Sequence, residues 1–138
     1  MITELTIGVV LGAVLVFCAR RRGSRGELVL YAIGLVVAAV IYVGFAFVGA
    51  AGPRWTALEV AGLLSFLAFT WLGLRRAPLW LAVGWAAHAI WDAGLHVLAG
   101  TPTFVPRSYP VFCVGFDLIV AAAIILRVRG KAAASEAA

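Results

Sequence analysis

Three ionisable side chains recur at four-residue spacing within one apolar stretch of the sequence. The segment 85–96 reads WAAHAIWDAGLH, which contains His88, Asp92 and His96. Residues four apart lie on one face of an α-helix. Imidazole and carboxylate groups transfer protons or bind metals, and ionisable groups at membrane depth are costly and commonly functional. This stripe is therefore the first candidate for a functional site.

The surroundings of the stripe are typical of a membrane protein. The chain has 138 residues, of which 64% are hydrophobic and 12% are charged, whereas soluble domains are about 25% charged. Five apolar runs are long enough to cross a bilayer as helices: they cover residues 3–19, 28–51, 55–74, 79–99 and 110–127. We therefore expect an all-α integral membrane bundle of five transmembrane helices. A single transmembrane domain is expected over residues 1–129, with a disordered tail over 130–138.

The basic residues predict how the bundle is oriented. Nine of the eleven Lys and Arg residues follow the first, third or fifth apolar run, and only Arg54 and Arg107 fall on the other side. Because loops rich in Lys and Arg stay in the cytoplasm, we expect an outer N-terminus and a cytoplasmic C-terminus, in the inner (plasma) membrane. The net charge of +5 fits this retention and contact with anionic lipid headgroups, and it does not indicate nucleic-acid binding.

Two more acidic residues are predicted to lie at the same membrane depth as the stripe. At 1.5 Å per residue, Glu59 lies about 6 Å and Asp117 about 10 Å from the outer ends of their helices. His96, Asp92 and His88 lie about 5, 11 and 17 Å from that side. We expect one shared polar site in the outer leaflet, formed by the three acids and His96, with His88 as its floor near the midplane.

The histidines and carboxylates of this site match the ligands of zinc, iron or manganese. His88 and His96 lie about 12 Å apart along the helix axis, so a single ion would have to stretch both imidazoles. The candidate metal ligands are therefore Glu59, Asp92, His96 and Asp117. A two-metal arrangement is an alternative, and the identity of a divalent cofactor stays open.

The same five groups could instead act without a metal as general acid and base. A protonated carboxyl beside an ionised one can isomerise, cyclise or hydrolyse a small apolar or lipidic molecule. The candidate substrate-binding residues are Trp85, Trp91, Arg107, Tyr109, Phe112 and Phe116. Core packing is the competing interpretation for each aromatic residue, and interfacial anchoring for Arg107 and Tyr109.

Two further interpretations stay open beside the enzyme. The histidine–aspartate stripe could form the proton or cation path of a transporter or channel. One observation argues against such a path: the three helices that carry the site have no carboxylate or histidine in their inner half. The pairs His88–Asp92 and His96–Asp117 could also be structural hydrogen bonds in a non-enzymatic protein. The oligomeric state stays open, a homo-oligomer included.

Close helix packing is expected at one pair of glycines. Gly8 and Gly12 form a small-xxx-small pattern in the first apolar run. Such a pattern lets the backbone of a neighbouring helix approach closely. We therefore expect another helix to lie against this face.

The segments WAAHAIWDAGLH (85–96) and FVPRSYPVFCVGFDL (104–118) resemble motifs of an uncharacterised family of small bacterial multi-spanning membrane proteins. In that family an H-x-x-W-D-x-x-x-H helix precedes a proline-containing loop and an aspartate in the next helix. The matching positions here are His88, Trp91, Asp92, His96, Pro110 and Asp117. The resemblance covers the last third of the chain and implies a membrane location but no particular activity.

Overall fold

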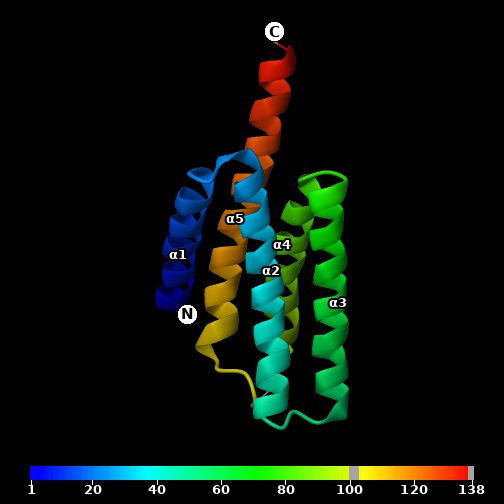
Figure 1. The fold of residues 1–138 in the computed structure, drawn as a ribbon. Helices are drawn as coiled ribbons and strands as arrows, with labels where there is room; N and C mark the ends of the chain where they lie inside the picture. Colours follow the sequence, from blue (N-terminus) through cyan, green and yellow to red (C-terminus); the bar gives the residue numbers. More distant parts are fainter. Residues whose placement is uncertain (100–102, 137–138) are drawn as a thin grey trace.

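The protein is all-α in its computed structural model, which describes residues 1–99 and 103–136. Its elements are α1 (Ile2–Arg20), α2 (Gly23–Val48), α3 (Pro53–Arg75), α4 (Leu79–Trp91), the π-helical segment η1 (Asp92–Leu98) and α5 (Ser108–Glu136) (Figure 1). Within the described residues, four helices (α1, α2, α3 and α5) are long and apolar enough to cross a membrane. The predicted all-α bundle of membrane-span helices is thereby confirmed.

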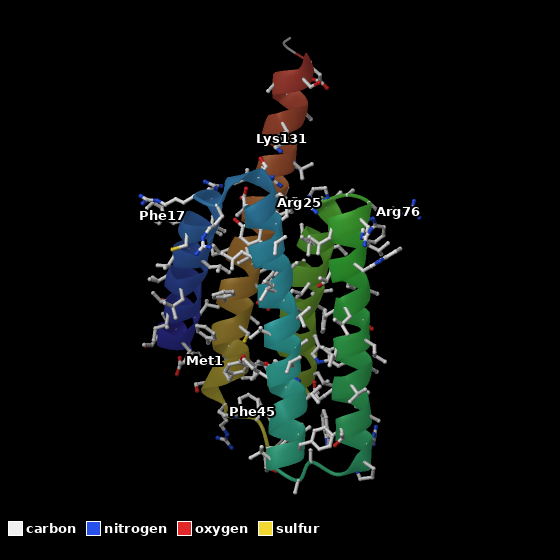
Figure 2. The ribbon with its side chains drawn as sticks, viewed as in Figure 1. Met1, Phe17, Arg25, Phe45, Arg76 and Lys131 are labelled. Atoms are coloured by element: carbon white, nitrogen blue, oxygen red, sulfur yellow. The ribbon has the colours of Figure 1, made fainter. Side chains whose placement is uncertain are left out.

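The helices run up and down through the bundle in alternation (Figure 1). The α1–α2 turn, the α3–α4 turn and the C-terminal part of α5 lie at one end, and the α2–α3 loop and the start of α5 lie at the other. Figure 2 places Arg25, Arg76 and Lys131 together at the first end. We call this the basic end, because nine of the eleven Lys and Arg residues of the chain fall in the segments gathered there.

The fourth apolar run does not form one regular α-helix. It was expected as a continuous helix over 79–99, but the α-helix ends at Trp91 and a π-helix takes over at Asp92. The backbone N–H of Ala99 donates to the carbonyl of Gly94 at 3.1 Å, the five-residue spacing of a π-helix. This widened turn changes the direction in which the side chains after Asp92 point.

The last helix is longer than the apolar run that predicted it. The expected disordered tail over 130–138 is wrong for its described part, because α5 continues to Glu136. Residues 132–134 are alanines, and alanine has the highest helix propensity of all residues. Helix propensity therefore extends α5 beyond the apolar run, and residues 137 and 138 lie outside the described part.

The apolar core contains buried side chains from all five α-helices. Tyr31, Leu35, Leu81, Trp85 and Ile124 are all fully buried there. Apolar side chains also cover much of the outer surface of the bundle, as expected where lipid is the solvent.

Helix α1 packs closely against α5 through glycines of both helices. A Cβ at Gly8 would overlap the carbonyl oxygen of Phe112, and a Cβ at Gly115 would lie 2.5 Å from the carbonyl oxygen of Leu5. A Cβ at Gly12 would lie 2.9 Å from the carbonyl oxygen of Phe116. The prediction that Gly8 and Gly12 admit a neighbouring helix is confirmed.

Replacing Gly8 by alanine should separate α1 from α5, because the new methyl group has no space against the α5 backbone. We expect Gly8→Ala to lower the free energy of unfolding by about 1–3 kcal/mol, as overpacking does. Gly44→Ala is the matched control, since nothing lies within 4 Å of a Cβ at that position. Denaturant unfolding in detergent micelles measures both. Equal stability of the two variants would contradict the assigned contact.

Candidate functional site

His88 is the centre of a fully buried cluster of ionisable groups. Its Nδ1 lies 2.8 Å from Oδ2 of Asp117 in α5 and 3.3 Å from Oδ2 of Asp92 at the start of η1. Because an ionised carboxylate only accepts hydrogen bonds, Nδ1 carries the proton in the contact with an ionised Asp117. We call these three residues the His88 cluster.

A second pair lies beside this cluster. His96 of η1 places Nε2 3.1 Å from Oε1 of Glu59 in α3, and both side chains are buried. The two nitrogens of His96 make no hydrogen bond of good geometry within the described residues, so the contact is one of charge and proximity.

Tyr42 of α2 lies between the two groups. Its ring stacks on His96 with a centroid distance of 4.5 Å and an interplanar angle of 16°. The same ring lies 5.8 Å from the ring of His88. The sequence analysis missed this residue, and the one available signal was that Tyr31 and Tyr42 are the only polar side chains in the apolar run 28–51.

The structure brings the five predicted ionisable residues into one region, but it groups them differently from the prediction. His88 was expected as the floor of the site, yet it contacts both aspartates directly. His96 is paired with Glu59 and not with Asp117. The reason lies in the backbone: α-helical spacing keeps His88 and Asp92 on one face, whereas the wider turn of η1 directs His96 toward α3.

The buried groups carry more negative than positive charge. The three carboxylates are accompanied by two imidazoles, and no Lys or Arg is among the buried residues of the described chain. Even with both imidazoles protonated, three ionised carboxylates would leave one uncompensated negative charge. Oδ1 of Asp92 and Oδ1 of Asp117 have no hydrogen-bond partner among the described residues. Because an unpaired buried charge is costly, the site must hold an extra proton or a cation.

The residues that could hold a metal differ from the predicted set. One ligand atom each from His88, Asp92 and Asp117 lie within 4.8 Å of one another. Of the expected ligands Glu59, Asp92, His96 and Asp117, only the two aspartates belong to this group, because η1 turns His96 away from them.

An apolar cavity of about 200 Å³ adjoins the cluster. Its walls come from α1, α2, α4 and α5, and they include Trp85, Tyr109, Phe112, Phe116 and Asp117. We call this cavity the aromatic pocket. Four of the six predicted substrate-binding residues line it. Trp91 does not: it lies beside Gly62 and Phe66 of α3. Arg107 does not either, since it lies exposed in the loop before α5.

Comparison with known proteins identifies one family. A model described as a family of unknown function (DUF6010) matches residues 2–130. No curated protein matches the chain, and no solved structure matches it. The match confirms that the chain belongs to a family of unknown function, and it covers nearly the whole chain.

Tyr42 provides a test of the site geometry. Its hydroxyl has no hydrogen-bond partner among the described residues, so Tyr42→Phe should change the free energy of unfolding by less than about 1 kcal/mol. Tyr31→Phe is the control, because the Tyr31 hydroxyl donates to Oε1 of Glu27 at 3.1 Å, and its removal should cost about 1–3 kcal/mol. Tyr42→Ala, which deletes the ring stacked on His96, should cost about 3–5 kcal/mol. Denaturant titrations in micelles compare the three variants, and a larger loss for Tyr42→Phe than for Tyr31→Phe would contradict the geometry.

Proposed function

We propose that this chain, which belongs to the DUF6010 family, is a membrane-embedded enzyme. The proposed enzyme moves a proton to or from a small apolar or lipidic substrate. Asp117 is the observation that carries the proposal. Asp117 is one of the residues that line the aromatic pocket, and its Oδ2 lies 2.8 Å from Nδ1 of His88. One acid therefore contacts both an apolar ligand space and a buried proton-transfer partner.

The chemistry proposed is general acid–base catalysis. Asp117 as a carboxylic acid delivers a proton to the substrate, and as a carboxylate it removes another. The Nδ1–H of His88 stabilises the carboxylate between these steps, and Asp92 contacts the same imidazole nitrogen from η1. An isomerisation or cyclisation balances with these transfers alone, since the proton gained at one carbon is lost from another.

The walls of the aromatic pocket suit an apolar substrate in which positive charge develops. Trp85 and Phe116 lie with ring centroids 5.7 Å apart on one side of it. Aromatic faces attract cations, most strongly where water is excluded. These rings would hold the substrate by apolar contact and lower the energy of a carbocation-like state.

The membrane placement is part of the proposal. We infer five crossings, with α4 and η1 together as the fourth, an outer N-terminus and the basic end in the cytoplasm of the inner membrane. The concentration of Lys and Arg at one end of the bundle supports this orientation. The aromatic pocket and the His88 cluster then lie toward the outer leaflet, where a lipid-soluble substrate can enter sideways.

An enzyme is better supported than a transporter or channel. Between the site and the basic end, the bundle interior contains Leu35, Leu81 and Ile124, all with an exposed fraction of 0%. A proton or ion path would need polar groups or water along this stretch. The dense apolar packing supports a site that opens to one side only.

The carboxylate of Asp117 should be required for turnover. Wild-type protein in lipid nanodiscs is incubated with bacterial lipid extracts, and mass spectrometry detects the converted component. We expect Asp117→Asn to lower the rate by about 10²–10⁴-fold, the usual contribution of a general acid or base. Glu136→Gln is the matched control, since it removes an exposed carboxylate from the same helix.

Ala38→Phe tests the pocket without altering the acid. Ala38 lines the aromatic pocket, so the larger side chain should fill part of the cavity and slow turnover.

A folded Asp117→Asn protein with wild-type turnover would refute the role of Asp117. Wild-type turnover in folded Ala38→Phe would refute the pocket.

A metal-assisted reaction is the second candidate, and the spacing of the His88 cluster favours it. Three ligand atoms within 4.8 Å of one another leave room for one ion, and a cation would balance the excess negative charge. If the reaction is metal-assisted, protein purified without chelators should contain about one zinc, iron or manganese ion per chain. Elemental mass spectrometry measures this metal content. His88→Gln should abolish binding, whereas His96→Gln, outside the cluster, should retain it. Metal-free wild-type protein that is active would exclude this form.

A further inference from the structure

A cavity at the basic end is separate from the site described above. It has a volume of about 510 Å³ and lies between α2, α5 and the turn from α3 to α4. Its walls include three cationic and three apolar side chains: Arg25, Arg127, Lys131, Leu28, Leu74 and Pro78. We call it the basic pocket. Its volume is within the range of about 300–1,000 Å³ that is common for ligand sites.

One cation of the basic pocket is held in place by a buried acid. Nε of Arg127 lies 2.8 Å from Oε2 of Glu27, and Nη2 donates to the carbonyl oxygen of Ser24 at 2.8 Å. Glu27 is buried and also accepts from the Tyr31 hydroxyl. The charge of Arg127 is thereby compensated, and its guanidinium has a fixed position in the wall.

The other two cations give the basic pocket its charge. Arg25 and Lys131 line it from α2 and α5, and no ion pair involves either of them within the described residues. No acid is among the lining residues. With Arg127 paired to Glu27, the wall keeps two uncompensated positive charges, which favour an anionic ligand.

The basic pocket adjoins a second groove between α2 and α3, which is lined by both apolar and cationic side chains. A second cavity of about 350 Å³ shares Arg25, Leu28 and Leu74 with it and adds Val29 and Arg75. Val29 and Leu74 are 39% and 45% exposed on the outer surface of the bundle. Cationic side chains and exposed apolar side chains thus lie next to each other at the end of the bundle, as the headgroup and acyl chain of an anionic lipid would require.

We propose that the basic pocket binds one anionic phospholipid, with the headgroup phosphate at Arg25 and Lys131 and an acyl chain against Leu28, Val29 and Leu74. Charge complementarity carries the choice of ligand, since basic pockets between helix ends select anionic headgroups. The apolar side chains of Leu28, Val29 and Leu74 favour a lipid over a free phosphate. This site is independent of the proposed enzymatic function.

Native mass spectrometry of the detergent-solubilised chain tests the lipid site. The protein is titrated with phosphatidylglycerol or with phosphatidylcholine, and the bound fraction is counted for each lipid. Wild-type protein should retain one phosphatidylglycerol in preference to phosphatidylcholine. The double variant Arg25→Gln/Lys131→Gln should bind phosphatidylglycerol roughly tenfold more weakly. Arg76→Gln/Arg129→Gln removes two exposed charges of the same end that do not line the cavity, and it should bind as the wild type does.

Three results would overturn the proposal. Equal losses in the two double variants would mean that the basic end attracts lipid only diffusely. Equal binding of the two lipids by the wild type would remove the charge selectivity. Release of phosphatidylglycerol by excess inorganic phosphate, but not by chloride at the same ionic strength, would show that the pocket recognises free phosphate. Circular dichroism confirms that each variant is folded before its binding is compared.

Discussion

The burial of three carboxylates inside an apolar helical bundle is the constraint on which the site depends. Glu59, Asp92 and Asp117 lie with His88 and His96 in a region without buried Lys or Arg among the described residues. Each group would be costly alone in a medium that solvates charge poorly. They are tolerated because α3, α4, η1 and α5 meet at one level and let each carboxylate share an imidazole. Charge neutrality at the site then requires a bound proton or cation.

The positions of these side chains depend on backbone features as well as on contacts between the side chains. The glycine contact between α1 and α5 brings one wall of the aromatic pocket close to the helix that carries Asp117. The π-helical segment η1 directs His96 away from Asp92, so that His96 contacts Glu59 of α3. Tyr42 fills the space between the two groups and contacts both imidazoles. The His88 cluster, Tyr42 and the His96–Glu59 pair therefore span five elements (α2, α3, α4, η1 and α5), and the aromatic pocket adjoins them.

The two ends of the bundle have different chemistry. One half combines buried acids with an aromatic cavity, which suits proton transfer to an apolar molecule. The basic end carries Arg25 and Lys131, which have no ion pair among the described residues, around a cavity that adjoins a groove with exposed Val29 and Leu74. The ion pair between Arg127 and Glu27 joins α5 to α2 there. Buried apolar side chains, among them Leu35, Leu81 and Ile124, lie between the two regions.

The sequence alone was sufficient for the all-α class, the membrane character, the alternation of basic loops and the convergence of five ionisable residues. These follow from composition, helix rise and the distribution of arginines, which are local properties. It could not predict which imidazole faces which carboxylate, because that depends on a π-helical turn of one segment and on the rotation of each helix against its neighbours. The role of Tyr42, the partner of Glu27 and the shapes of both cavities likewise arise only where separate helices meet. These features depend on tertiary packing, because each contact or cavity between helices is formed by side chains from two or more separate segments.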